Sequence, residues 1–198
     1  MTRTDTRLAH AIERLDALHA EDPRRVDVGG ETLPHELHYA RCMSAWLVRV
    51  APEASEALRL AVRAQHLQRW QIPRDDYPRD RPGYLAWRRE LGRRQAETAA
   101  EVLREVGYDA ATGERVAGLI RKEGLRRDPE TQALEDTACL VFLDNEFAEF
   151  ATRHDEGKIL RILRKTWAKM SPRGHELAMT LDLPGEAQAL VQRALSST

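Results

Sequence analysis

Apolar side chains recur every three or four residues along almost the whole chain, which is the spacing of one face of an α-helix. Leu8, Ile12, Leu15 and Leu18 follow this spacing near the N-terminus. No segment shows the alternation of β-branched and polar residues that is typical of a half-buried strand. The pattern therefore predicts an all-α protein, a bundle of several helices in a single domain.

Prolines, glycines and capping residues divide this pattern into separate helices. Gly107 follows the last turn of one helix, and Asp128-Pro129 combines an N-cap acceptor with a proline at the first helical position. Segments 22–34 and 71–83 are predicted as loops, and the second is an ordered loop or a lid because it holds three prolines. The predicted helices cover residues 5–20, 34–50, 52–70, 84–106, 112–122, a stretch from 129 through the apolar residues 137–143, 156–169, a short turn from 172, and 185–195.

Composition and charge narrow the class of protein. The 198 residues include 31 Lys or Arg and 32 Asp or Glu, a net charge of -1, which argues against binding to nucleic acid or membranes through bulk positive charge. No apolar run approaches the roughly 20 residues that span a bilayer, and the N-terminus lacks the apolar stretch of a signal peptide. We expect one cytoplasmic domain over residues 1–198, with a peripheral helix and loop in 1–30 and a core in 34–180. Cys42 and Cys139 lie in apolar helical patterns, which favours core residues over a disulfide.

Asp136 is the most informative polar position, because its helix is otherwise apolar just beyond it. Cys139, Leu140 and Leu143 stand three, four and seven residues further on. This spacing places the carboxylate on an apolar face, with Glu135 beside it. A buried carboxylate requires a hydrogen-bond, ionic or metal partner. Asp136 is therefore either a structural ion-pair partner of an arginine or a catalytic or metal-binding carboxylate.

Two histidines also lie on predicted apolar faces. His66 continues the stripe of Leu58 and Val62 at four-residue spacing. His38 lies near the start of the second predicted helix, where His35 competes with it. Each is either a core histidine with satisfied hydrogen bonds or a functional group. The other histidines have mostly polar neighbours and are predicted to lie on the surface: His10, His19, His154 and His175.

His38, His66 and Asp136 follow one another on three predicted helices, which resembles the HD superfamily of metal-dependent phosphohydrolases. The resemblance implies an HD-like domain in which these three residues bind one divalent metal (Mn, Fe, Ni or Mg) and in which His66, Glu135 and Asp136 are catalytic. Such a cation lowers the pKa of a bound water and neutralises a phosphate. Leu67 follows His66, so the His-Asp dipeptide of the superfamily is absent, and Glu135 or a water would fill its place.

A closer resemblance covers about residues 35–180 and concerns a bacterial and fungal family described as domain of unknown function 4202. Three strings carry it: RAQHLQRWQIPRDDYPRDRPGYLAWR, LEDTACLVFLDNEF and LRKTWAKMSPRGHELAM. The family implies no established activity. Gln95 stands where the family often has His, and Leu can stand where this chain has His38.

Basic residues gather in two places. Residues 157–174 hold six Lys or Arg and no Asp or Glu, and Lys158, Lys165 and Lys169 share a predicted helical face. This face is either a solvated outer surface or a phosphate clamp. Arg69 and Arg74 lie among Trp and Tyr residues in and near the 71–83 loop. They either hold a nucleobase and its phosphates or brace the loop by stacking.

The sequence thus predicts a divergent HD-like protein that hydrolyses a nucleotide or another small phosphate ester with a divalent metal. Arg69, Arg74, Lys165 and Lys169 would hold the phosphates. The alternative is a non-catalytic helical module that binds a nucleotide, an RNA or a protein through the Arg-rich loop and the basic helix. We expect a small phosphorylated ligand as the partner ahead of nucleic acid, and no membrane.

Overall fold

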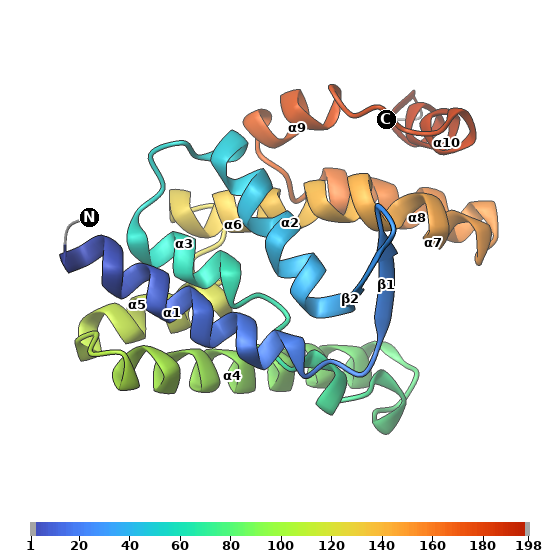
Figure 1. Ribbon diagram of the computed structural model, residues 1–198. Coiled ribbons are helices and arrows are strands. Elements are labelled where there is room, and N and C mark those ends of the chain that lie inside the picture. Colours follow the sequence, from blue (N-terminus) through green and yellow to red (C-terminus); the bar gives the residue numbers. More distant parts are fainter. Residues whose placement is uncertain (1–2, 197–198) are drawn as a thin grey trace.

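The computed structural model describes residues 3–196 and confirms the all-α prediction (Figure 1). The elements are α1 (Arg3–Ala20), β1 (Arg25–Val28), β2 (Glu31–Pro34), α2 (His35–Val50), α3 (Glu56–Arg63), η1 (Arg69–Gln71), η2 (Arg74–Asp76), α4 (Arg81–Glu105), α5 (Ala110–Ile120), α6 (Pro129–Val141), η3 (Phe142–Glu146), α7 (Phe147–Thr152), α8 (Glu156–Trp167), α9 (Pro172–Ala178) and α10 (Gly185–Ser196).

The core lies where α2 crosses α6. α2 packs against α6 and α3, while α4 packs along α5 on one side, and α8 and α10 pack together on the other (Figure 1). Met43, Leu60, Leu134, Leu140 and Phe147 are completely buried between these helices. Removal of this apolar surface from water is the main force that holds the bundle together. No helix within residues 3–196 combines the length and the apolar character that crossing a bilayer requires.

The segment predicted as a loop over 22–34 contains a β-hairpin instead. β1 pairs with β2 in antiparallel register, with Val26 opposite Leu33. Gly29 and Gly30 form the connection with φ angles of 59° and 89°. Two consecutive positive φ values suit the tight turn that matches the twist of a hairpin, and glycine adopts them without strain. The hairpin brings Arg24 beside the start of α2.

The helix predicted over 52–70 is much shorter. α3 begins only after Ser55, whose hydroxyl accepts a hydrogen bond from the backbone N–H of Leu58 at 3.1 Å. It ends at Arg63, and the chain then turns through His66 and Gln68, both in the left-handed backbone region. This turn directs His66 and the η1 segment toward the start of α2.

The basic helix predicted over 156–169 is also shorter, because α8 ends at Trp167. Ser171 then caps α9 by accepting a hydrogen bond from the N–H of Gly174 at 3.2 Å. Lys169 therefore lies in the connection between two helices and not on the helical face of Lys158 and Lys165.

Candidate functional site

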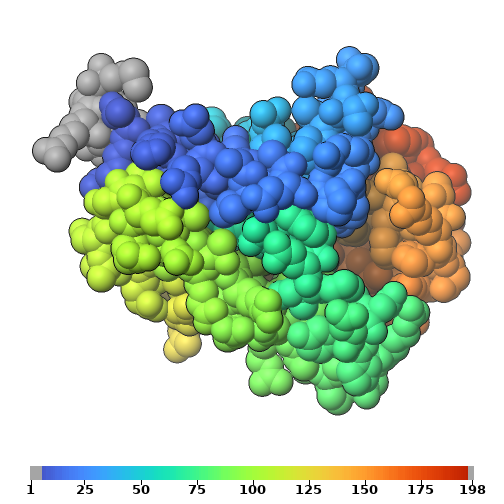
Figure 2. All heavy atoms as spheres, turned by 60° about the horizontal axis from the view of Figure 1, so that its bottom comes forward, coloured from blue at the N-terminus to red at the C-terminus, as the bar shows by residue number. Residues whose placement is uncertain are grey.

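A pocket of about 420 Å³ opens at the surface between the start of α2, the turn after α3 and the segment η3–α7. Figure 2 shows the hollow between the blue and teal segments on one side and the orange segment on the other. Most of its lining is charged: Arg24, His35, Glu36, His66, Arg69, Glu146, Glu149, Phe150, Arg153 and His154. His35 and Glu36 stand in the first turn of α2, and Glu146 stands in the π-helical turn η3.

Glu36 is the buried carboxylate of this pocket, with 1% of its surface exposed. Its Oε1 accepts a hydrogen bond from Arg24 Nη2 at 2.5 Å. Burial raises the pKa of such a carboxyl, but here the contacts from His66 and Arg24 outweigh it and lower the pKa to about 2. Glu36 is therefore an anion throughout the physiological pH range.

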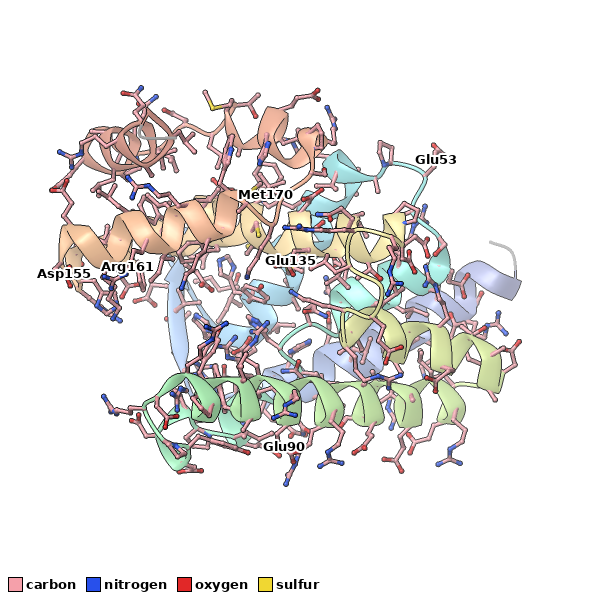
Figure 3. All side chains as sticks on the ribbon, turned by 180° about the vertical axis from the view of Figure 1, so that it is seen from behind. Glu53, Glu90, Glu135, Asp155, Arg161 and Met170 are labelled. Carbon is pink, nitrogen blue, oxygen red and sulfur yellow. The ribbon has the colours of Figure 1, made fainter. Side chains whose placement is uncertain are left out.

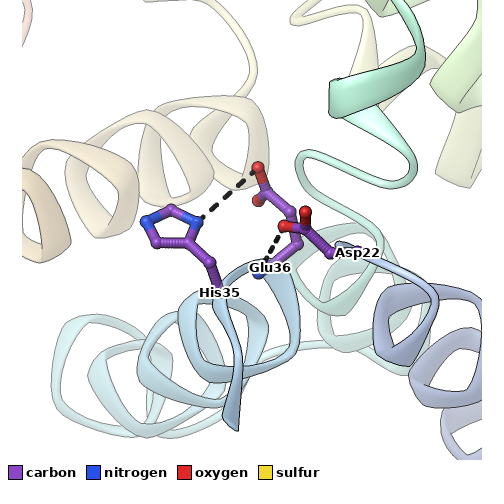
Figure 4. A group of neighbouring side chains, drawn as sticks. All are labelled: Asp22, His35 and Glu36. Carbon is purple, nitrogen blue, oxygen red and sulfur yellow. Dashed lines mark hydrogen bonds and ion pairs between the residues drawn. The ribbon is translucent and has the colours of Figure 1, made fainter. Parts of the chain in front are cut away.

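Asp22, His35 and Glu36 have ligand atoms within 4.8 Å of one another (Figure 4). This spacing could accommodate a cation, but Arg24 already supplies one. Its Nε and Nη2 donate to the two oxygens of Asp22 at 3.1 and 2.9 Å, and Nη2 also reaches Glu36. One guanidinium thus bonds to both carboxylates and offsets part of their charge.

His66 is held in one orientation and one tautomer. Its ring stacks on Tyr39 with centroids 4.2 Å apart. Arg69 Nη1 lies 2.8 Å from His66 Nε2, and since arginine only donates, Nε2 must accept and Nδ1 must carry the proton. Nδ1 faces Glu36 Oε2 at 3.5 Å. Burial, and next the charge of Arg69, lowers the pKa of His66 to about 3, so the ring is neutral at pH 7.

Glu146 is the second carboxyl with a perturbed pKa in the pocket. It ends η3, a single π-helical turn inserted between α6 and α7. Such turns are rare and frequently occur at functional sites. Burial raises the pKa of Glu146, whereas the pKa of Glu36 is lowered. The pocket therefore holds two carboxyl groups whose environments push their pKa values apart.

Asp136, predicted as a metal ligand or catalytic group, is buried as expected and has structural partners. Its Oδ1 accepts hydrogen bonds from the backbone N–H of Ser171 at 2.8 Å and from Gln132 Nε2 at 3.1 Å. Its Oδ2 accepts a hydrogen bond from the Ser171 hydroxyl. The carboxylate thus fixes the start of α9, and its partner is neither the arginine nor the metal that the sequence left open.

Glu135 and Lys169, predicted as a catalytic carboxylate and a phosphate ligand, contact each other. Lys169 Nζ lies 3.4 Å from Glu135 Oε1, and Lys122 forms an ion pair with Glu135 Oε2. The sequence prediction assigned no role to Lys122. Its ammonium group nevertheless points inward, toward the carboxylate of Glu135. Lys165 is exposed on α8.

His38, Arg74 and Gln95 lie outside the pocket lining. His38 is half-buried on α2 with its ring beside the thiol of Cys42, and burial lowers its pKa. Arg74 donates to the carbonyl oxygens of Tyr77 and Pro78, both at 2.8 Å, so it braces the loop. Gln95 is buried on α4 beside a separate hollow.

The three metal ligands predicted from the sequence do not converge on one point in the fold. Within residues 3–196, His38, His66 and Asp136 do not form a group whose ligand atoms converge. Asp136 Oδ1 and Oδ2 bind Ser171, and Arg69 occupies His66 Nε2. These donors therefore do not fit one ion.

Of the histidines predicted on the surface, His10 is exposed, His154 and His175 are half-buried, and only His19 is buried. His19 is completely buried, and its Nε2 lies 2.9 Å from the carbonyl oxygen of Arg63. His175 stacks on Trp167 with ring centroids 3.9 Å apart. His154 lines the pocket. Cys42 and Cys139 are free thiols, and Cys139 is buried in the core.

Comparison with known proteins identifies the family and nothing beyond it. The model of a family described as domain of unknown function (DUF4202) matches residues 9–191, so the chain belongs to that family. The match includes most of α1, whereas the sequence resemblance began near residue 35. No curated protein and no solved structure matches the chain.

Proposed function

We propose that this member of the family binds a small phosphorylated compound in the 420 Å³ pocket and hydrolyses its phosphate ester bond. The observation that carries the proposal is Arg69. It lines the pocket, donates to His66 and lies over the ring of Trp87 at 5.0 Å. Across residues 3–196 it faces no carboxylate at ion-pair distance. A guanidinium has five N–H donors, so several of those of Arg69 are available to phosphate oxygens.

The other two arginines of the pocket are already neutralised. Arg24 bonds to Asp22 and Glu36, and Arg153 forms an ion pair with Glu149. These groups shape the pocket and orient its acids, while Arg69 supplies the positive charge for an anionic group. The volume suits a small molecule, because ligand pockets typically measure several hundred Å³.

Hydrolysis of a phosphate ester requires a proton for the leaving oxygen as water attacks phosphorus. Glu146 lines the same pocket and, through burial, retains its proton to higher pH than an exposed glutamate. Glu36 stays ionised and holds His66 in one tautomer. Two carboxyls with pKa values shifted in opposite directions are the arrangement from which acid and base roles are assigned.

The Arg-rich loop and the basic segment support the alternative, a non-catalytic nucleic-acid or protein module, less well. Arg74 is engaged with loop carbonyl oxygens. Lys169 contacts Glu135, and Arg173 contacts Glu176 and the carbonyl oxygen of Arg49. Fewer cations are therefore free for a macromolecular partner than the sequence predicts.

The test measures binding and hydrolysis separately. Purified protein, stripped with EDTA and then assayed with and without Mn²⁺ or Mg²⁺, is offered a panel of nucleotides and phosphate monoesters, and released phosphate is quantified. Calorimetry measures the binding of inorganic phosphate. Arg69→Gln should weaken phosphate binding roughly tenfold or more, since it removes a charged hydrogen-bond donor. Arg59→Gln is the matched control, because Arg59 is exposed on α3.

Three results bear on the proposal. Binding of phosphate compounds that depends on Arg69 and not on Arg59 supports the binding site, and phosphate release supports hydrolysis. Binding without release from any member of the panel would remove the hydrolytic half. A wild-type protein that binds no phosphate compound, with or without metal, would overturn the whole proposal.

A further inference from the structure

A second hollow, of about 330 Å³, lies between α4 and the segment 67–72. We call it the Gln95 hollow, after one residue of its lining. Leu67, Ile72 and Leu91 are at most 9% exposed and form its apolar part. Within residues 3–196, no residue lines both this hollow and the 420 Å³ pocket. The two are therefore separate candidate sites.

Gln95 brings an unpaired polar group to this hollow. The residue is 6% exposed, and its Nε2 is buried without a hydrogen-bond partner in the described part of the chain. Buried polar groups in proteins nearly always have such a partner. Leu91, Gln95 and Thr98 are spaced four and three residues apart on α4, so they share one face of the helix, and all three line the hollow. Apolar side chains with a few placed polar groups are the usual lining of a small-molecule site.

The wall opposite α4 has a strained backbone. His66 and Gln68 have φ angles of 62° and 50°, in the left-handed region that residues other than glycine rarely adopt. His66 and Arg69 line the 420 Å³ pocket, whereas Leu67 and Gln68 line the Gln95 hollow. One short segment thus presents its residues to both cavities. Strain of this kind is concentrated at functional sites.

The charged side chains of the Gln95 hollow already have counter-ions. Arg93 pairs with Glu97, with Nη1 and Oε2 2.6 Å apart. Arg93 and Arg94 both pair with Glu90, which Figure 3 labels on α4. Glu101 also has an arginine partner within α4. The lining holds two arginines and two glutamates, so it offers no net charge to a charged ligand and favours an uncharged one.

We infer that the Gln95 hollow binds an uncharged nucleobase. The buried leucine and isoleucine side chains would contact the ring, and the Gln95 amide would bond to its polar edge. A glutamine amide carries a donor and an acceptor side by side, which is the arrangement that pairs with N6 and N7 of adenine. The inference concerns a site apart from the 420 Å³ pocket, so it does not rest on the proposed function.

Two probes of nearly identical shape isolate the hydrogen bond to Gln95. 7-Azaindole has a ring-nitrogen acceptor next to its N–H donor, whereas indole has the N–H donor alone. Nuclear magnetic resonance titrations of the full chain measure the affinity of both probes and follow the side-chain amide signals of Gln95. Adenine and adenosine are then tested as competitors of 7-azaindole.

The decisive variant is Gln95→Met, which removes the amide and keeps a side chain of similar length. Gln188→Met is the matched control, because Gln188 is exposed on α10. Circular dichroism first establishes that each variant is folded at the assay temperature. If Gln95→Met does not fold, the preference of the wild type between the two probes and the shift of its Gln95 signals decide the question.

The wild type should bind 7-azaindole roughly threefold or more tightly than indole, because only 7-azaindole accepts a hydrogen bond. The Gln95 amide signals should move with 7-azaindole. Gln95→Met should abolish the preference and change the affinity for indole less than about twofold, whereas Gln188→Met should behave like the wild type. Adenine or adenosine should displace 7-azaindole, and the stronger competitor shows whether the ligand is a free base or a nucleoside.

Four results would overturn the inference. The first is a wild type that binds no probe, or that binds indole and 7-azaindole equally. The second is a preference for 7-azaindole that survives in Gln95→Met, or Gln95 signals that do not move. The third is failure of both adenine and adenosine to compete. The fourth is displacement of 7-azaindole by inorganic phosphate, which would place the probe in the 420 Å³ pocket. The first three leave the proposed function untouched, and the fourth supports phosphate binding in that pocket.

Discussion

Replacement of Asp136 by alanine tests whether this carboxylate is structural. The side chain is 2% exposed and accepts hydrogen bonds from the backbone N–H and the hydroxyl of Ser171, and from Gln132. α9 approaches so closely that a Cβ added at Gly174 would lie 2.8 Å from Asp136 Oδ1. The start of α9 therefore depends on one buried anion, and its removal leaves the Ser171 donors without their acceptor.

The expected loss of stability in Asp136→Ala follows from these contacts. A hydrogen bond to a charged group contributes about 1.5–3 kcal/mol, and the three bonds share one acceptor group, so their effects are not additive. We expect Asp136→Ala to reduce the free energy of unfolding by about 4 kcal/mol, which for a domain of this size lowers the melting temperature by about 8–16 °C. Asp136→Asn keeps one acceptor oxygen and the side-chain volume, and should lose about half as much.

Thermal and urea unfolding, followed by circular dichroism at neutral pH with and without added Mn²⁺, measure the loss. Asp182→Asn is the control, since Asp182 is an exposed aspartate in the connection after α9. An Asp136→Ala protein that melts like the wild type would refute the structural assignment. A stabilisation by Mn²⁺ that is present in the wild type and absent from Asp136→Asn would instead restore the metal ligand predicted from the sequence.

Three further outcomes are expected. Glu36, whose pKa is lowered from 4.5 to about 2, contributes stability above about pH 4.5 and loses it as the pH falls through about 2. Urea titrations between these limits should show the wild type losing about 3 kcal/mol more than Glu36→Gln, and parallel curves would contradict this. Gly83→Ala should destabilise the start of α4 by about 2 kcal/mol or more, because the new Cβ would lie 2.2 Å from the backbone oxygen of Pro78; an unchanged melting temperature would exclude that contact. Leu140→Ala, at a completely buried position, should cost about 2–5 kcal/mol by urea unfolding, whereas Leu85→Ala, at a 48% exposed position, should cost less than about 1.

The helical architecture was predictable because its signals are local. The 3.6-residue period marks buried faces, and side-chain caps mark helix starts. Asp128 accepts hydrogen bonds from the N–H groups of Glu130 and Thr131, and Ser171 accepts one from Gly174, at the two starts that the sequence indicates. A capping bond involves residues two or three positions apart, so the sequence contains both partners within one turn.

The sequence predictions of secondary structure are wrong where no local pattern marks the element. The hairpin has strands of only four residues, too short for alternation to be distinguished from a loop. α3 stops at Arg63 although Ala64 and Leu67 would continue its apolar face. The chain leaves the helical path through left-handed conformations at His66 and Gln68. Histidine and glutamine, unlike glycine, do not indicate such a turn in the sequence.

The candidate site was predictable only in part for the same reason. His66 and Arg69 are three residues apart, and the sequence marked both; the structure places them in contact. Glu36 reaches His66 across 30 positions, and its partner Arg24 stands directly before the hairpin that the sequence did not predict. The burial of Asp136 could be inferred from its apolar neighbours, but the identity of its partner depends on how α9 packs on α6.

Arg88 and Arg89 show that residue type alone does not indicate which of two adjacent side chains is buried. The two are adjacent and chemically identical, and the sequence provides no reason to prefer either. One residue along an α-helix is a rotation of about 100°, so only one of the pair can follow Trp87 toward the interior. The bundle leaves Arg89 in solvent and half-buries Arg88, whose charge lowers the pKa of Arg69 and of Lys122. The geometry of α4 therefore decides which of the two arginines is withdrawn from solvent.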